Sequence, residues 1–169
     1  MDDRILIAYA TKHGSTEGIA RAIGKAFTEE GAQADVKPVG EAGEPGGYRA
    51  VVLGSPLYAG KVLGGIRRFA EEHAEELRSM PTALFFVCLT MAQPSERAVQ
   101  KVVKQTKPLV ELVRPRDVGL FAGALDYADL GFFNRLLMKL MKIREGDFRK
   151  WDVIERWAKD LLPRLQDTS

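Results

Sequence analysis

The sequence has few of the residues that build covalent or metal-held sites, with one cysteine and two histidines among 169 residues. A single thiol, Cys88, forms no intramolecular disulfide and no cysteine-based zinc site, which is typical of a protein in a reducing compartment. His13 and His73 have no cysteine or histidine at ligand spacing, so we expect no metal site. These shortages exclude the disulfide-stapled and zinc-finger classes of small protein.

Long apolar runs are also lacking. No segment approaches the ~20 apolar residues of a membrane-spanning helix. The apolar run that begins at Ile5 is too short for the core of a secretory signal, and acidic residues precede it. We therefore expect a cytoplasmic protein, and attachment to the inner face of a membrane stays open.

Charge of one sign is not in large excess, because 25 Lys and Arg face 23 Asp and Glu and the net charge is +2. Such a balance gives no indication of a nucleic-acid partner. The distribution is uneven, since residues 131–150 hold six basic and two acidic residues, a local net charge of +4. The chain length is that of one domain, residues 1–169, with a single well-buried core.

What the sequence does contain is a regular alternation of apolar strand-like runs and helical patterns. We predict strands at residues 4–10, 34–39, 50–54, 82–90 and 117–125. We predict helices at residues 15–31, 62–79, 94–113, 131–143 and 151–165. This order is typical of a doubly wound α/β fold with a parallel sheet, in which ligands bind beyond the carboxyl ends of the strands. The loops expected to carry function are therefore residues 11–16, 55–61 and 90–94.

The first of these loops is rich in hydroxyl groups, carried by Thr11, Ser15 and Thr16. A strand-to-helix turn presents backbone N–H groups at the positive end of the helix dipole, and hydroxyls add hydrogen bonds to phosphate without adding charge. Gly14 lets the backbone approach closely, and Lys12 is the only lysine or arginine in the loop. This favours one monoester phosphate over a triphosphate with its metal. The alternative is an ordinary capped turn with Ser15 as the N-cap.

The second loop is part of the segment GSPLYAGKV, residues 54–62. It is not a Walker A loop, because five residues separate Gly54 from Gly60 and Val62 follows Lys61. A phospho-acceptor receiver domain is rejected as well, because that domain needs an aspartate where Ser55 stands. We expect an exposed Tyr58 that stacks on a planar ligand. The alternative is that its ring packs on the neighbouring loop.

The third loop carries no histidine and no pair of carboxylates, so no acid–base machinery is evident. Cys88 falls in the interior of a predicted strand and is interpreted as a core residue and not as a nucleophile. Trp151 and Trp157, on the last predicted helix, are interpreted as packing residues.

Together the three loops resemble those of the flavodoxin family. Thr11-Lys12-His13-Gly14-Ser15-Thr16 resembles the family's T-x-T-G-x-T loop for the FMN phosphate, with His13 in place of the second threonine. Ser55-Pro56-Leu57-Tyr58-Ala59-Gly60 resembles the loop along the isoalloxazine, with Tyr58 as the stacking ring. Thr90-Met91-Ala92-Gln93 falls where the family covers the pyrimidine end with backbone groups. The resemblance spans nearly the whole chain and implies a flavodoxin-like, five-stranded parallel sheet of order 2-1-3-4-5. It also implies FMN as the cofactor that carries the redox chemistry.

Within that family the chain is most similar to the menaquinone-dependent protoporphyrinogen oxidase branch. The similarity lies in GALDYADLGFFNRLLMKLMKI (residues 123–143), in WDVIERWA on the last helix, and in RSMPTALFFV. Two features depart from the branch, namely a shorter REGDFRK stretch at residues 144–150 and a 55–61 loop like that of generic flavodoxins. The resemblance implies an FMN-dependent enzyme with a helical insertion after the fifth strand, at about residues 126–150. It also implies a porphyrinogen-like electron donor and a quinone acceptor.

The predicted insertion helix has a broad apolar face and a basic stripe. The candidate substrate-side or membrane-side residues are Arg135, Lys139 and Lys142 on this helix and Tyr127, which precedes it in the insertion. Such a helix can lie in a membrane interface or cover an apolar substrate. It can also pack on its own sheet or on a second copy of the chain. Because the phosphate and ring loops lie far upstream, we expect flavin binding to be independent of this helix.

Two other functions stay open. One is a flavodoxin-type carrier of electrons between proteins, which the net positive charge and the presence of Lys12 and Lys61 in the flavin loops disfavour, because carriers are typically acidic around the flavin. The other is an NAD(P)H-dependent quinone reductase, although no segment resembles a nicotinamide site.

Overall fold

A parallel sheet forms the centre of the computed structural model, which describes residues 3–167 apart from the side chain of Asp129. Its strands lie in the order β2-β1-β3-β5-β6. They are β1 (Ile5–Tyr9), β2 (Ala34–Pro38), β3 (Ala50–Tyr58), β5 (Thr82–Val87) and β6 (Asp117–Phe121). Counted along the parallel strands alone, this is the predicted order 2-1-3-4-5, so the prediction of a doubly wound α/β sheet is confirmed.

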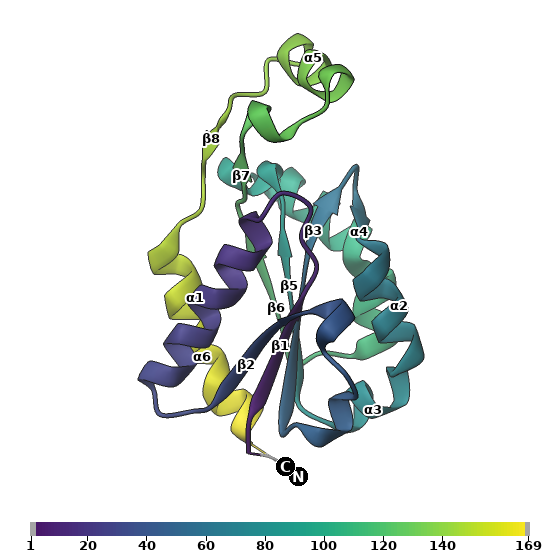
Figure 1. Ribbon diagram of the computed structural model, residues 1–169, viewed down its shortest axis with the longest axis vertical. Helices are drawn as coiled ribbons and strands as arrows, with labels where there is room; N and C mark the ends of the chain where they lie inside the picture. The colour runs from purple at the N-terminus through teal and green to yellow at the C-terminus, as the bar shows by residue number, and fades with distance from the viewer. Residues whose placement is uncertain (1–2, 168–169) are drawn as a thin grey trace.

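The central strands are apolar throughout because helices cover both faces of the sheet. Ile7 of β1 lies opposite Val52 of β3, which lies opposite Ala83 of β5, and all three side chains are fully buried. One face carries α1 (Ser15–Glu29) and α6 (Trp151–Gln166), and the other carries α2 (Gly64–Glu72), α3 (Ala74–Ser79) and α4 (Glu96–Val113) (Figure 1).

Each face has its own apolar core. Beneath α1 and α6, Phe27 packs with Phe85, and Trp157 lies edge-on to Phe121 with the ring centroids 5.3 Å apart. The packing role predicted for Trp157 is therefore confirmed. Trp151 does not join this core, because 44% of its surface is exposed. Its indole is instead covered in part by Arg149, whose guanidinium carbon lies 4.6 Å from the ring centroid.

The second functional loop is a β-hairpin and not an irregular loop. Strand β3 continues to Tyr58 and pairs antiparallel with β4 (Lys61–Val62). The turn between them consists of Ala59 and Gly60, with φ angles of 48° and 75°. Positive φ at both turn residues is the geometry whose twist matches that of the flanking strands. The hairpin also delays the following helix to Gly64, and that helix is interrupted at His73.

Several predicted boundaries near the loops are wrong. Ser15 is the first helical residue of α1 and not its N-cap, a position that Gly14 occupies with a φ of 85°. Strand β5 ends at Val87, so Cys88 lies beyond the strand and is half-buried. Helix α4 begins at Glu96, because Ser95 caps it by accepting a hydrogen bond from the backbone N–H of Ala98.

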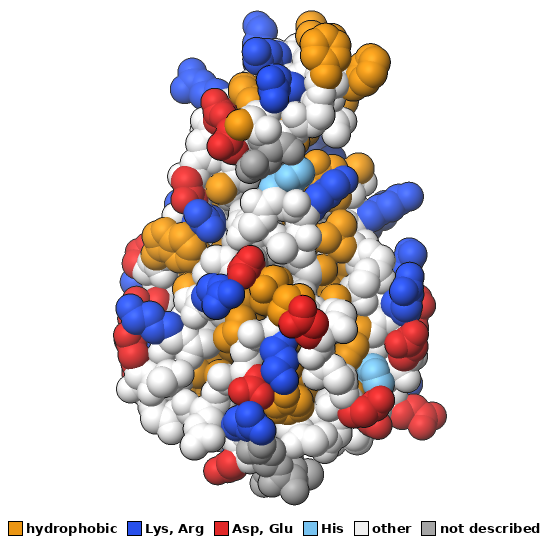
Figure 2. All heavy atoms as spheres, in the orientation of Figure 1, with side chains coloured by type: hydrophobic (Ala, Val, Ile, Leu, Met, Phe, Trp, Pro, Cys, Tyr) orange, Lys and Arg blue, Asp and Glu red, His pale blue; other side chains and the backbone are white. Residues whose placement is uncertain are grey.

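The insertion between β6 and α6 pairs with itself. Strand β7 (Ala124–Leu125) pairs antiparallel with β8 (Gly146–Asp147), and α5 (Phe132–Leu140) lies between them in the chain. Figure 1 shows this segment projecting beyond the end of the sheet, with α5 at the tip. Figure 2 shows apolar and basic side chains gathered at the same tip.

Gly54 of β3 is a position where the packing of the sheet depends on the absence of a side chain. An added Cβ would lie 2.0 Å from a ring carbon of Phe85, which is fully buried and held near Phe121 and Trp157. We expect Gly54→Ala to lower the free energy of unfolding by about 1–3 kcal/mol, the range for overpacked cores. Urea unfolding measures this change. Gly64→Ala is the matched control, because its added Cβ would meet nothing within 4 Å. Equal stability of the two variants would contradict this account of Gly54.

Candidate functional site

The loops after β1, β3 and β5 meet at one edge of the sheet, beneath the insertion (Figure 1). The first loop is folded on itself, because the Thr11 hydroxyl oxygen accepts a 2.8 Å hydrogen bond from the backbone N–H of Gly14. The N–H of Gly18 then begins the helical ladder by donating to the carbonyl of Gly14. The N–H groups of the first turn of α1 have no partner within the helix, and they lie at its positive end. This end of α1 can therefore bind an anion.

Thr16 lies on the first turn of α1 and carries an unpaired polar atom. Its side chain is fully buried, and its hydroxyl oxygen is one of three buried side-chain polar atoms among the described residues that lack a hydrogen-bond partner. An unmade buried hydrogen bond costs about 1–3 kcal/mol. A ligand with acceptor oxygens at the start of α1 would satisfy this hydroxyl.

Tyr58 is half-buried and contacts the first loop, whereas the sequence predicted an exposed ring. The ammonium nitrogen of Lys12 lies 4.0 Å from the centroid of the Tyr58 ring. His13 Nε2 lies 3.3 Å from the Tyr58 hydroxyl, within hydrogen-bond distance. Lys12 is thus directed to the ring of Tyr58, in a favourable cation–π position. Stacking of Tyr58 on a planar ligand stays a prediction.

The other residues of the hairpin hold it in place. Ser55 is buried, donates a 2.8 Å hydrogen bond to the carbonyl of Pro56 and accepts one of 3.0 Å from the N–H of Leu63. Leu57 packs against the core beneath α4. Gly60 faces Gln105, because an added Cβ would lie 2.5 Å from its side-chain nitrogen. In this structure the bonds made by Ser55 fix the hairpin to the start of α2.

The third loop lines a cavity of about 450 Å³ together with the insertion. Thr90, Ala92 and Gln93 form one side, and the other is formed by Lys142, Ile143, Arg144 and Phe148. Met91 is buried and packs with Val102 and Ala122, so it anchors the loop. Burial raises the pKa of the Cys88 thiol, which agrees with its interpretation as a packing residue and not a nucleophile.

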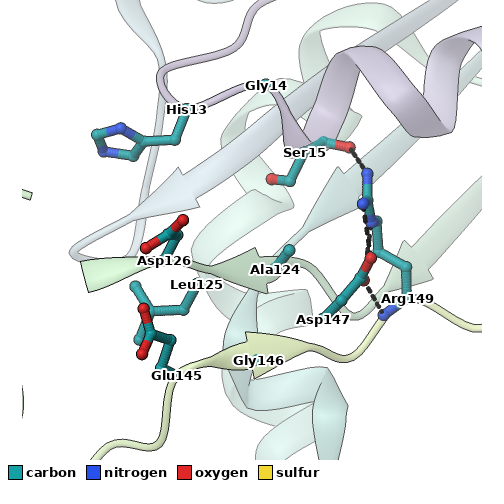
Figure 3. Close-up of a pocket in the computed structure, with 10 residues that line it drawn as sticks. All are labelled: His13, Gly14, Ser15, Ala124, Leu125, Asp126, Glu145, Gly146, Asp147 and Arg149. Atoms are coloured by element: carbon teal, nitrogen blue, oxygen red, sulfur yellow. Dashed lines mark hydrogen bonds and ion pairs between the residues drawn. The ribbon is translucent and has the colours of Figure 1, made fainter. Parts of the chain in front are cut away.

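A second cavity, of about 550 Å³, lies between the first loop and the paired strands of the insertion (Figure 3). His13, Gly14 and Ser15 form one side. The other side is formed by Ala124, Leu125, Asp126, Glu145, Gly146, Asp147 and Arg149. The segment that returns from α5 to α6 is therefore a wall of this cavity, opposite the first loop. No residue of the predicted helix at 131–143 lines it, and the independence of flavin binding from that helix stays a prediction.

The carboxylates of this wall are held by backbone N–H groups. Asp126 accepts a 2.8 Å hydrogen bond from the N–H of Ala128, which, together with a hydrogen bond to Glu145, lowers the pKa of Asp126. Glu145 accepts a 2.9 Å bond from the N–H of Tyr127. Sequence reasoning missed both carboxylates, because they lie far apart in the chain and are brought together only by the pairing of β7 with β8. They reach the cavity near His13 (Figure 3).

The candidate residues of the insertion divide into two groups. The Tyr127 hydroxyl donates to the carbonyl of Ile143, and Arg135 Nε donates to the carbonyl of Tyr127 at 3.0 Å, so these two side chains hold the insertion together. Lys139 and Lys142 are exposed. Of the basic stripe expected from helical spacing, Arg135 therefore bonds within the insertion, whereas Lys139 and Lys142 face solvent.

Helix α5 does not pack on the sheet, which excludes one of the interpretations of its sequence. It has no buried residue in the described part of the chain. Met138 of this helix is half-buried. The other large apolar side chains are between 46% and 83% exposed, and they are Phe132, Phe133, Leu136, Leu137, Leu140 and, just after the helix, Met141. We call these six residues the apolar tip.

At the end of the molecule opposite the insertion, one histidine and two glutamates lie together, and their positions in the sequence did not predict this contact. His73 Nδ1 lies 3.5 Å from a carboxylate oxygen of Glu44 and 3.8 Å from one of Glu76. Both glutamates are exposed, and exposed acidic groups commonly gather in this way without a metal ion. The cluster lies beside α3, away from the cavities.

Comparison with known proteins agrees with this geometry. A family model described as a flavodoxin domain matches residues 6–150. A protein of Escherichia coli K12 named protoporphyrinogen IX dehydrogenase (quinone) is 32% identical over 170 residues, covering 94% of this chain and 94% of the relative. A protein of the same name from Leishmania major is 29% identical, covering 93% of this chain and 74% of the relative.

Solved structures share the fold at lower identity. Oxidised flavodoxin 2 from Bacillus cereus has a TM-score of 0.61 at 17% identity, covering 95% of this chain and 99% of that one. A flavodoxin from the domain Archaea has a TM-score of 0.59 at 14% identity, covering 97% and 99%. Since the family model covers most of the chain and a 32% identical relative covers nearly all of it, this chain belongs to the flavodoxin family.

Proposed function

We propose that the protein binds FMN at the edge of the sheet, with the phosphate at the start of α1. The observation that carries this proposal is the unpaired, fully buried hydroxyl of Thr16 in the first turn of a helix that follows a glycine with a φ of 85°. Phosphate oxygens would satisfy that hydroxyl and the N–H groups of the turn. Residues 11–16 would hold the phosphate, the hairpin with Tyr58 would lie along the ring, and residues 90–93 would cover its other end. FMN is preferred to FAD in this proposal, because FAD would need room and donors for a second phosphate and an adenosine.

We further propose that the protein is an enzyme that oxidises protoporphyrinogen IX or a similar donor and passes the electrons to a quinone. FMN, when bound, accepts electrons from the donor and passes them on. The names of the 29–32% identical relatives support this choice of donor and acceptor. So does the cavity between the third loop and the insertion, because Phe148 and Ile143 suit an apolar ring system, and Lys142 and Arg144 suit the carboxylates that a porphyrinogen carries.

The purified protein tests this proposal directly. We expect it to be yellow, to release FMN and not FAD when it is denatured, and to oxidise protoporphyrinogen with a menaquinone as acceptor. NADPH, used as the donor in a parallel assay, should not support quinone reduction, and its success would identify a quinone reductase instead. A holoprotein that exchanges electrons with protein partners but does not oxidise protoporphyrinogen would be a carrier. A colourless protein that ignores added FMN would reject the cofactor as well.

We also propose that the apolar tip rests on the cytoplasmic face of a membrane, where lipophilic quinones dissolve. No helix within residues 3–167 has the length and apolarity needed to cross a bilayer. The tip does, however, expose six large apolar side chains, and the exposed cations beside it are Lys139, Lys142 and Arg144. An apolar face next to cations is typical of helices that lie in an anionic interface. The single cysteine supports a reducing compartment.

Vesicle binding provides the test of this membrane contact. We expect the combined change of Lys139, Lys142 and Arg144 to Gln to weaken binding to phosphatidylglycerol-rich vesicles by about 1 kcal/mol for each charge. Phe132→Ser with Phe133→Ser should weaken binding to both anionic and neutral vesicles, because it removes apolar contact. Co-sedimentation with vesicles measures both effects.

A matched control exists on α4, where Lys101, Lys104 and Lys107 are exposed and distant from the tip. Their combined change to Gln removes the same charge and should leave vesicle binding nearly unchanged. If the two charge variants bind vesicles equally well, the tip is not the contact. Self-association that the two serine substitutions abolish would identify a second copy of the chain as the partner of the tip.

A further inference from the structure

We infer that Arg149, at the end of the insertion, supplies the cation that binds the FMN phosphate. This inference rests on the proposed cofactor. Lys12, the one lysine or arginine of residues 11–16, has its ammonium group 4.0 Å from the Tyr58 ring centroid, on the ring side of the site. Arg149 lies on the phosphate side instead, because it lines one cavity with Gly14 and Ser15, although 134 residues separate it from Ser15 in the chain.

The guanidinium of Arg149 is held in a fixed orientation. Its Nε and Nη2 atoms donate to the two carboxylate oxygens of Asp147, at 2.9 and 2.6 Å. Those bonds lower the pKa of Asp147, so the carboxylate stays ionised at neutral pH and the pair persists. The guanidinium carbon also lies 4.6 Å from the centroid of the Trp151 ring, and only 18% of the Arg149 side chain is exposed. Such a bidentate, stacked arrangement suits arginine and not lysine.

This orientation leaves Nη1 facing the first turn of α1. Its contact there is a weak 3.5 Å bond to the carbonyl of Ser15 (Figure 3). Because Nη1 carries two hydrogens, it can donate to an anion at the start of the helix. Gly18 permits this approach, since a Cβ at that position would lie 2.6 Å from Nη1. The sequence therefore leaves room on α1 for the arginine.

The distribution of charged side chains around the cavity also favours an anion beside Arg149. In Figure 3, Ser15, Asp147 and Arg149 lie at one end, whereas Asp126 and Glu145 lie at the other, near His13. The carboxylate nearest to Arg149 is Asp147, which the arginine already neutralises. A phosphate at the start of α1 would meet Nη1 and the helix N–H groups, with the two remaining carboxylates at the far end. The insertion would then be part of the flavin site and not only of the substrate site.

A comparison of FMN with riboflavin isolates the phosphate, because riboflavin has the same ring and ribityl chain without it. Apoprotein is titrated with each flavin, and quenching of flavin fluorescence gives the dissociation constants. We expect Arg149→Gln to weaken FMN binding by about 10- to 100-fold, as for loss of a charge-assisted hydrogen bond, and to leave riboflavin binding nearly unchanged. Arg149→Lys should restore part of the loss. Asp147→Asn should weaken FMN binding by a smaller factor, because it frees the guanidinium.

The control variant is Lys150→Gln, which removes an equal charge from the adjacent exposed residue. It should bind both flavins as the unchanged protein does. Equal losses for FMN and riboflavin in Arg149→Gln would overturn the inference and assign Arg149 a packing role with Trp151. Unaltered FMN binding would overturn it too. If the unchanged apoprotein binds neither flavin, the proposed function itself fails, and this outcome is distinct because it appears before any substitution is made.

Discussion

The constraint on which the rest of the structure depends is the parallel pairing of β1 with both β2 and β3. Parallel neighbours need crossover connections, so helices must cover both faces of the sheet, and the strands between them must be apolar throughout. The same pairing brings the carboxyl ends of β1, β3 and β5 to one edge, beside the point where the strand order reverses. The order of the strands alone is therefore enough to bring together the hydroxyl-rich turn, the hairpin of Tyr58 and the loop after β5.

The insertion adds a second, much smaller pairing to this edge. Because β7 pairs with β8, the insertion is stabilised without a place in the main sheet, and no residue of α5 in the described part of the chain is buried. Its +4 charge consequently divides among three environments. Arg135 bonds to carbonyls inside the insertion, Lys139 and Lys142 face solvent near the apolar tip, and Arg149 turns back toward α1. A basic stretch that reads as one patch in the sequence is three separate features in space.

The parts of this structure that were predictable are those that periodicity or a local motif encodes. Buried strands such as β1 and β5 are continuous apolar runs, and the turn at Gly14 carries its own signature, so the parallel sheet and the position of the first loop followed from the sequence. The order of the strands in the sheet followed only from the resemblance to the flavodoxin family. The bond between Arg149 and Asp147 and the nearness of Asp126 to Glu145 did not follow. They depend on two strands of two residues each, too short to produce an alternation pattern. For Tyr58 the sequence left two interpretations open, and the structure shows the one in which the ring contacts the neighbouring loop. Residue spacing alone could not decide between them, because it carries no information on side-chain contacts between loops.

If FMN binds beside α1 as proposed, the walls shared by the first loop and the insertion would make flavin binding and the position of the insertion thermodynamically dependent on each other. The cavity beside Ser15 ends at Arg149, and the same short strand β8 that carries Asp147 closes the hairpin from which α5 projects. If Arg149 binds the phosphate, FMN stabilises one position of β8 and therefore of the hairpin. A surface that holds α5 in that same position must then raise the affinity for FMN by the factor by which FMN raises the affinity for the surface. This coupling of FMN affinity to surface affinity would not help a carrier that exchanges electrons with soluble proteins. It would help an enzyme whose quinone is dissolved in lipid, because the flavin would bind most tightly to the protein at the membrane.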